Sequence, residues 1–405
     1  MPQRAAFGIL ASLAMALGVF LSGFVIREPA PYEIYMAGLI GIWAIAGLKL
    51  SRHIAPLIAL YIIFNIGGMV SILTMDDVRD TPMYIAVSLF LAFTAMFFAA
   101  VIEEDWRRLK LIFRAYLAAA IITALLGIFG YFHLIPGGEA FTRYDRAMGA
   151  FQDPNVFGPF LVLPSLYLMH GLLGGTLRAA PLRAAGLLVL TLGVFLSFSR
   201  AAWGLYVLSM VLLVGAMLIR ERTGAFRLRI LVMTLIGLAL AIGAILVALQ
   251  IDQVAELFTN RAKLVQAYDG ARLGRFERHK IGFLMALERP LGIGPLEFGL
   301  MWGEDTHNIW LKALMDYGWL GFLAYTILIA WTIVLGLRYV LRERPWQPYL
   351  MLTLIVLIGH TMIGNVIDTD HWRHFYLLMG IVWGCIALEQ RWQRRLRASR
   401  TPASA

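Results

Sequence analysis

Cysteine is nearly absent from this chain. Among its 405 residues there is one cysteine, Cys385, and it lies inside the last apolar block of the sequence. A single thiol cannot form an intrachain disulfide and cannot build a thiolate cage for a metal ion. Any loop outside the cytoplasm must therefore be held by packing and hydrogen bonds.

Charge is also scarce. Charged residues make up 15% of the chain and hydrophobic residues 60%, whereas soluble domains have roughly 25% and 45–50%. The apolar residues form blocks of about 20 with almost no charge inside them, which is the length that crosses the hydrocarbon of a bilayer. These proportions exclude a water-soluble protein and predict an all-α polytopic membrane protein.

About twelve transmembrane helices are expected, with a large outer loop over residues 251–308 between helices nine and ten. The first block lacks a small-residue cleavage site and exceeds a signal-peptide core, so we interpret it as a retained helix. The spans are predicted at residues 5–26, 34–50, 55–74, 83–102, 115–132, 156–175, 185–197, 201–219, 230–250, 309–337, 349–366 and 375–389.

The basic residues set the orientation. The net charge is +10, but Lys and Arg occur in small clusters between apolar blocks, which is unlike the single basic face of a nucleic-acid-binding protein. With the N-terminus inside, 21 basic residues fall on the cytoplasmic side and 6 in the short outer loops. The positive-inside rule then places both termini in the cytoplasm.

We expect a membrane domain over residues 1–389, including the outer loop, and a basic cytoplasmic tail over 390–405. Apolar residues at helical spacing predict two amphipathic surface helices in the outer loop, separated by a turn at 267–274. The first helix is indicated by Val254, Leu257, Phe258, Val265 and Tyr268, and the second by Phe276, Phe283 and Leu287.

Few ionisable residues fall inside the spans, mainly His170, Lys312, Asp316 and His360. A coupled transporter normally holds its ions on buried carboxylates or broken helices near mid-membrane. The scarcity of such groups therefore argues against a transporter. Polar residues gather instead at four places on the outer side.

The first place is the tight turn Ser197–Arg200, which divides one apolar stretch into two spans. An arginine there can present its fork of donors to a phosphate at headgroup depth. The alternative is an interfacial arginine that reaches toward water. The second place is a basic face formed by Arg272, Arg275, Arg278, His279 and Lys280, which either attracts anionic headgroups or binds a second phosphate.

The third place opens the tenth helix. His307 lies beside Glu304 and Asp305, where a neutral imidazole can take a proton from a hydroxyl and a carboxylate raises its basicity. The alternative is a helix cap made by Thr306 or Asn308.

The fourth place is the polar loop 143–158, with Arg146, Asp153 and Asn155. Its Asp-Pro-Asn sequence is a turn and helix-entry signal, and a structural role alone explains it. The GIGP segment at 292–295 resembles a phosphate-cradling loop only weakly, because it lacks the P-loop lysine. A further cluster has residue types that bind metal ions, namely Asp368, Asp370, His371 and His374. A short polar loop explains this cluster more simply.

Together these places resemble the O-antigen ligase and polymerase superfamily, which are bacterial membrane glycosyltransferases with a large loop between helices nine and ten. His307-Asn308, followed by Gly318 and Gly321, fits the ligase signature of that family. Ser197–Arg200 fits its Ser-x-Ser-Arg turn. Segments 274–298 and 146–155 fit its Arg…Pro-Leu-x-Gly-x-Gly-Pro…Phe and Arg…Gly…Asp-Pro-Asn loops. One departure is His279, where the family often has tryptophan.

The resemblance implies a glycan donor on undecaprenyl diphosphate and an active site at the periplasmic face of the inner membrane. Arg200, Arg275 and Arg272 would bind the diphosphate, and His307 would orient or deprotonate the acceptor hydroxyl for inverting attack. Arg146, Asp153, Asn155 and Asn308 would support the acceptor or the loops. No metal, nucleotide sugar or other cofactor is implied.

The acceptor separates the two activities of the superfamily. A ligase transfers the finished polymer to lipid A-core, whereas a polymerase transfers it to another lipid-linked repeat unit. The histidine signature favours a ligase, and the polymerase is the alternative. From other classes, a flippase or transporter for a lipid-linked sugar or small anion, and then a structural membrane partner, are more distant alternatives.

Overall fold

The computed structural model describes residues 2–221, 223–263 and 274–399. Within these residues the elements are helices, apart from one short antiparallel ladder between β1 (Thr142–Arg143) and β2 (Arg146–Ala147). The predicted all-α class is confirmed. The chain forms two compact units, one of residues 1–39 and 110–264, the other of residues 40–109 and 265–405.

Seven described helical segments are long and apolar enough to cross a membrane, and three shorter ones are also apolar. The chain is therefore a multi-pass membrane protein, while the number of twelve spans stays a prediction. The seven segments are Ala55–Thr74, Thr81–Glu104, Arg108–Tyr131, Pro154–Gly174, Arg200–Arg220, Gly224–Ala248 and Gly318–Val340, and the shorter ones are Gly8–Leu21, Ala180–Leu196 and Gln347–Ile363.

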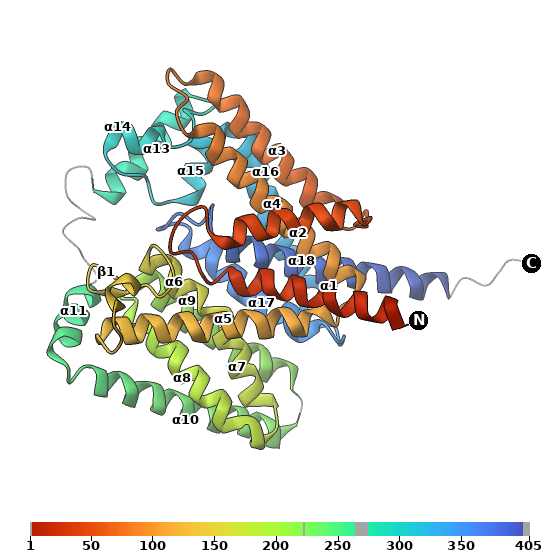
Figure 1. Cartoon of the computed structure of the whole chain (residues 1–405), viewed down its shortest axis with the longest axis vertical. Coiled ribbons are helices and arrows are strands. Elements are labelled where there is room, and N and C mark those ends of the chain that lie inside the picture. The colour runs from red at the N-terminus through yellow and green to blue at the C-terminus, as the bar shows by residue number, and fades with distance from the viewer. Residues whose placement is uncertain (1, 222, 264–273, 400–405) are drawn as a thin grey trace, which may run out of the picture. The chain divides into compact units, whose positions relative to one another are not determined.

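The first unit combines the N-terminal segment of the chain with a long central segment (Figure 1). It contains α1 (Pro2–Leu21), most of α2 (Pro31–Ile45), α5 (Arg108–Tyr131), the 3-10 turns η2 (Gly138–Phe141) and η3 (Leu177–Ala179), α6 (Pro154–Phe160), α7 (Val162–Gly174), α8 (Ala180–Leu196), α9 (Arg200–Arg220), α10 (Gly224–Ala248) and α11 (Asp252–Ala262).

The predicted span 156–175 is interrupted at Leu161, where α6 ends and α7 begins. Pro164 explains the break, because a proline has no N–H for the preceding turn and its ring collides with the carbonyl four residues back. Short α6 then packs tightly against the turn between α8 and α9. A Cβ at Gly158 would lie 2.6 Å from Cβ of Ala202 and 2.9 Å from Oγ of Ser197, so only glycine permits this approach.

The second unit has a buried helical core. It contains α3 (Ala55–Ser71), the 3-10 turn η1 (Ile72–Thr74), α4 (Thr81–Glu104), α13 (Arg275–Glu288), α14 (Glu297–Trp302), α15 (Ile309–Asp316), α16 (Gly318–Val340), α17 (Gln347–Ile363) and α18 (Arg373–Ala398).

Helices α4 and α18 pack against each other in the core of this unit. Phe97 and Phe98 on α4 and Trp383 on α18 are fully buried. At the far end of α18 the buried carboxylate of Glu389 pairs with Arg342 at 3.2 Å and Arg344 at 2.9 Å. Since α18 continues to Ala398, the first part of the predicted tail is helical.

The predicted helix 309–337 is wrong as a single helix, because Tyr317 separates α15 from α16. The loop at 290–294 explains the break. Its Ile293 N–H donates to the carbonyl of Met315 at 2.7 Å, and its Pro290 carbonyl accepts from Trp319 N–H at 3.0 Å. Gly318 has a φ of +62°, and a Cβ there would lie 2.7 Å from the Leu291 backbone. The GIGP segment thus satisfies backbone groups that the break exposes.

The outer loop has the predicted helical content in its described parts, α11 and α13. Phe276, Phe283 and Leu287 are exposed along α13, as expected of an amphipathic helix, and its membrane-surface position stays a prediction. Val265, Tyr268 and most of the predicted turn at 267–274 lie outside the described residues.

Candidate active site

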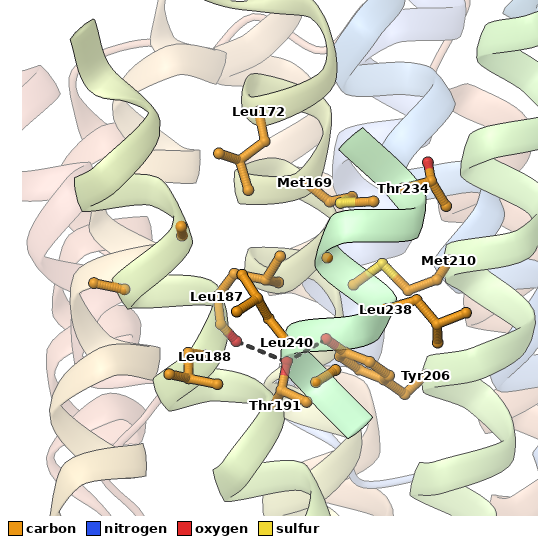
Figure 2. A pocket seen from close by; sticks show the side chains of 14 residues that line it. Met169, Leu172, Leu187, Leu188, Thr191, Tyr206, Met210, Thr234, Leu238 and Leu240 are labelled. Carbon is orange, nitrogen blue, oxygen red and sulfur yellow. Dashed lines mark hydrogen bonds between the residues drawn. The ribbon is translucent and has the colours of Figure 1, made fainter. Parts of the chain in front are cut away.

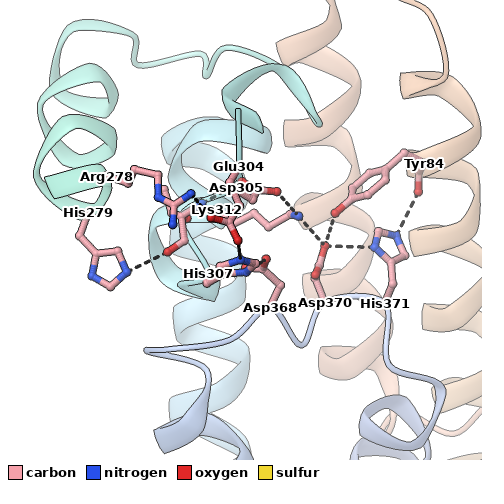
Figure 3. A network of polar contacts seen from close by, with 11 residues as sticks. Tyr84, Arg278, His279, Glu304, Asp305, His307, Lys312, Asp368, Asp370 and His371 are labelled. Carbon is pink, nitrogen blue, oxygen red and sulfur yellow. Dashed lines mark hydrogen bonds and ion pairs between the residues drawn. The ribbon is translucent and has the colours of Figure 1, made fainter. Parts of the chain in front are cut away.

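His307 lies in the second unit, on the loop between α14 and α15, and is held between two carboxylates (Figure 3). Its Nδ1 is 3.1 Å from Oδ2 of Asp368, and its Nε2 is 3.0 Å from Oε1 of Glu304. The His307 backbone has a φ of +51°, a left-handed conformation that is uncommon for a residue with a side chain. Such outliers gather at functional sites.

The two carboxylates differ in exposure. The side chain of Asp368 is 19% exposed and that of Glu304 is 58% exposed, with His307 between them at 33%. The less exposed carboxylate, on Nδ1, fixes the orientation of the ring and the tautomer of its neutral form. The open side of the ring is therefore Nε2, where a substrate hydroxyl can replace the exposed Glu304.

Both carboxylates affect the basicity of the imidazole. The hydrogen bond to Asp368 raises the pKa of His307 above its ordinary value, burial opposes this, and the charges of Asp368 and Glu304 add to the increase. A pKa displaced upward from the ordinary histidine value of about 6.5 makes the ring a stronger base.

Arg278 on α13 holds Glu304 beside the histidine. Arg278 donates from Nη1 to Oε2 of Glu304, and its own side chain is 6% exposed. Burial tends to raise the pKa of Glu304, but the hydrogen bonds from His307 and Arg278 lower it overall. The carboxylate therefore stays ionised.

A second layer of charge lies behind these residues. Lys312 on α15 is 2.8 Å from Oδ2 of Asp305 and 3.9 Å from Oδ2 of Asp370. Asp370 accepts from the hydroxyl of Tyr84 and lies 3.0 Å from Nδ1 of His371. Asp305, expected beside His307, therefore bonds to the lysine instead.

Arg275 is the first residue of α13 and is partly buried. Four residues on, Nε2 of His279 donates to the carbonyl of Thr306 at 2.8 Å. An indole N–H is also a donor, so a tryptophan here could serve the same carbonyl. Arg272, the other predicted diphosphate ligand of this segment, lies outside the described residues.

Asn308 forms the N-terminal cap of α15. Its Oδ1 accepts from the N–H groups of Trp310 at 3.0 Å and Leu311 at 3.2 Å, and its Nδ2 donates to the carbonyl of Asn365 at 3.2 Å. The side chain thus joins the loop before α15 to the loop after α17. This is loop support, while the cap predicted for Thr306 is not formed by its hydroxyl.

In the first unit, Arg200 begins α9 directly after the N-cap Ser199, whose hydroxyl accepts from Ala202 N–H at 3.4 Å. The guanidinium of Arg200 donates to the carbonyl of Lys263 at 3.3 Å. This places a cation at the N-terminus of α9, where the helix dipole also favours an anion.

The loop 143–158 is anchored by a buried arginine. Nε of Arg146 donates to the carbonyl of Ser197 at 2.7 Å, and its Nη2 donates to Oδ1 of Asn155 at 2.8 Å. Asp153 caps α6 by accepting from Asn155 N–H at 2.6 Å. Arg146, Asp153 and Asn155 therefore brace the α8–α9 turn, and an acceptor role for them stays a prediction.

The possible metal ligands do not converge. Asp368 bonds to His307, Asp370 belongs to the lysine cluster, and His374 lies 3.2 Å from Nε2 of His360. Within the part of the chain that the structure describes, no group of three or more His, Cys, Asp and Glu side chains could hold a metal ion.

Sequence reasoning did not connect Asp368 with His307. The two residues are separated by 61 positions, and nothing in either local pattern indicates that their loops meet. The one available signal was a carboxylate in a short polar loop between two spans. Arg278 was identified only as part of a basic face.

An apolar cavity of about 320 Å³ lies among α7, α8, α9 and α10 of the first unit (Figure 2). Its few polar groups include the hydroxyls of Thr191 and Tyr206, which are 2.5 Å apart and bonded to each other. With those groups paired, the walls offer leucine, methionine and alanine side chains such as Met169, Leu188 and Met210.

A helical fold with several segments long and apolar enough to cross a membrane is that of a multi-pass membrane protein, and His307 with its two carboxylates is its candidate active site. Residues 185–326 match the family model described as O-antigen ligase. The match confirms the resemblance to the O-antigen ligase superfamily over these residues and supports a membrane enzyme of O-antigen ligase or polymerase type. Comparison with curated proteins and with solved structures gave no match.

Proposed function

We propose that the protein transfers a glycan from undecaprenyl diphosphate to a sugar hydroxyl of lipid A-core, at the periplasmic face of the bacterial inner membrane and with both termini in the cytoplasm. The observation that carries this proposal is His307 between Asp368 and Glu304. It lies inside the segment that matches the O-antigen ligase family.

In the proposed reaction His307 first loses its Nε2 proton to solvent, which releases Glu304, while Nδ1–H stays bonded to Asp368. The acceptor hydroxyl then takes the place of Glu304 and donates to the unprotonated Nε2. The acceptor oxygen attacks the anomeric carbon of the donor in line, and its proton passes to Nε2. The new carbon–oxygen bond forms as the bond to the diphosphate breaks, so the electron pair leaves with the phosphate. A single displacement inverts the anomeric configuration.

The diphosphate needs stabilisation more than it needs a proton. As a leaving group it is already a stable polyanion, and arginine forks bind phosphate oxygens in pairs. We assign this role to Arg200, Arg275 and Arg272. The reaction as proposed takes its positive charge from these side chains, without a metal ion, a nucleotide sugar or another cofactor.

The cavity among α7 to α10 supports a lipid-linked donor. Tyr206 and Met210 line it, and they follow Arg200 on α9 by 6 and 10 residues. At 1.5 Å per residue these positions lie about 9 and 15 Å along the helix from Arg200. A lipid with its phosphates at Arg200 would place the first part of its isoprenoid chain at this depth, where the walls are apolar.

The alternative is an O-antigen or exopolysaccharide polymerase, which would use the same chemistry with a lipid-linked acceptor. Deletion of the gene separates the two. Lipid A-core capped by single repeat units indicates a lost polymerase, whereas long chains retained on the lipid carrier indicate a lost ligase.

Two histidines with nearly the same backbone conformation provide a matched test. His307 has a φ of +51° and the exposed His133 of the first unit a φ of +54°. Asparagine tolerates this conformation, so His307→Asn and His133→Asn strain the backbone equally. We expect His307→Asn to reduce glycan transfer from a lipid-linked donor by on the order of 10³-fold, with His133→Asn near the wild-type rate. Equal rates for both variants would refute the proposal.

A further inference from the structure

Lys312 is a buried cation next to the proposed active site. It belongs to α15, and its side chain is 7% exposed. A buried ammonium is unfavourable unless anionic partners compensate it. Lys312 has two such partners, Asp305 at 2.8 Å and Asp370 at 3.9 Å, and its Nζ is 5.4 Å from the centre of the Tyr84 ring.

The two partners come from different loops. Asp305 is on the loop between α14 and α15, next to Glu304 and two residues before His307. Asp370 is on the loop between α17 and α18, two residues after Asp368. One ammonium thus ties together the two loops that supply the carboxylates of the histidine.

A second tie joins the same loops on the other side of the His307–Asp368 pair. The N–H of Ile309 donates to the carbonyl of Gly364 at 2.7 Å, close to the bond from Asn308 to Asn365 already described. In both loops, the His307–Asp368 pair therefore lies between the Ile309–Gly364 backbone bond and the residues that bind Lys312.

The Asp370 end is itself fixed to a buried helix. Tyr84, on α4, donates its hydroxyl to Asp370, and the Tyr84 carbonyl accepts from Nε2 of His371 at 3.2 Å. Because α4 packs against α18 in the core of the second unit, Asp370 has a rigid support. The lysine transmits this support to Asp305 and so to the loop of His307.

We infer that Lys312 is a positioning residue that sets the separation between His307 and Asp368 by binding Asp305 and Asp370 at once. This inference rests on the proposed function, because it concerns the geometry of the same histidine. It predicts a loss of rate without a loss of substrate affinity, since Lys312 is buried behind the loops.

The substitution to examine is Lys312→Met, which keeps the length of the side chain and removes its charge. A small misplacement of a catalytic group costs on the order of 100-fold in rate, so kcat should fall by about that factor with KM little changed. Lys312→Arg keeps the charge and should retain more activity than Lys312→Met. The exposed Lys110 on α5 provides the control Lys110→Met, with wild-type kcat.

The protonation of His307 is a measurement that would not change if Lys312 had a purely structural role. His307 is faced by Glu304 and Asp368, with Arg278, His279, Asp305 and Lys312 around them. Removing the lysine leaves the carboxylates of Asp305 and Asp370 uncompensated, and negative charge favours the imidazolium. The pH below which His307 is protonated should rise in Lys312→Met and stay near wild type in Lys312→Arg.

Modification of His307 by diethyl pyrocarbonate, followed across pH by mass spectrometry of the purified full chain, measures this protonation without any enzymatic assay. An upward displacement in Lys312→Met, with a fall in kcat, supports the inference. An unchanged modification curve, or activity lost only in proportion to folded protein, overturns it. If the wild-type chain transfers no glycan, the proposed function fails, but the modification curve still decides whether Lys312 acts on His307.

Discussion

Arg146 in the first unit and Arg278 in the second are both buried arginines, but their donors serve different partners. Arg146 donates to the carbonyl of Ser197 and the amide of Asn155, which are neutral groups of its own unit. Arg278 donates to the carboxylate of Glu304, which is largely exposed and also bonds to His307.

This difference separates structure from chemistry. The bonds that Arg146 donates to Ser197 and Asn155 fix a loop. Arg278 instead helps to keep ionised the exposed carboxylate beside the histidine, which the acceptor replaces in the proposed reaction. A buried arginine thus indicates a catalytic site only when its partner also contacts a reactive group.

The largest effect should come from Asp368, the partly buried partner of His307. In Asp368→Asn the carboxylate no longer orients the ring or stabilises its protonated form, so we expect kcat to fall by on the order of 10²- to 10³-fold. The pKa of His307 should fall as well, moving the acid limb of activity to lower pH. The pH dependence of kcat/KM checks both. An unchanged limb would show that Asp368 does not govern the histidine.

An intermediate effect is expected at Arg275. In Arg275→Lys the charge remains but the paired donors are lost, so binding and transfer should fall by roughly 10- to 100-fold if the guanidinium binds diphosphate. The matched variant Lys280→Arg changes the head group of an exposed neighbour on α13 and should have little effect. Near wild-type transfer by Arg275→Lys would favour general attraction to anionic headgroups.

The smallest effect per folded molecule is expected at Arg146. Arg146→Met removes the hydrogen bonds from a charged donor to Ser197 and Asn155, which should lower stability by about 2 to 4 kcal/mol. Activity should decline only as far as folded protein declines, measured by thermal unfolding in detergent beside the transfer assay. A loss of kcat or a raised KM for the acceptor in fully folded protein would show that Arg146 binds the acceptor and does not only support the loop.

The helices were predictable because apolar blocks of membrane-crossing length determine them. The breaks at Leu161 and Tyr317 were not, since each depends on a local conflict: Pro164 in one case, and in the other the insertion of the 290–294 loop beside Gly318. Single-sequence periodicity measures average apolarity and does not register such insertions.

The candidate site was predictable in part. His307 and its neighbour Glu304 are close in sequence, so their contact follows from local reasoning. Asp368 and Asp370 reach the site because α15, α17 and α18 bring two distant loops together, and sequence spacing carries no record of that pairing. The same limit applies to Lys312, which periodicity placed inside a span although it pairs with loop carboxylates.

The central claim is that His307, held by Asp368, acts as the base. The most direct test is the pH dependence of kcat/KM for glycan transfer by the purified wild-type protein, because its acid limb reports the free enzyme. The base must be neutral and the pKa of His307 is raised, so activity should be lost as pH falls through a value above the ordinary histidine pKa of about 6.5. An acid limb below that value, or a flat profile from pH 5 to 8, would contradict the account.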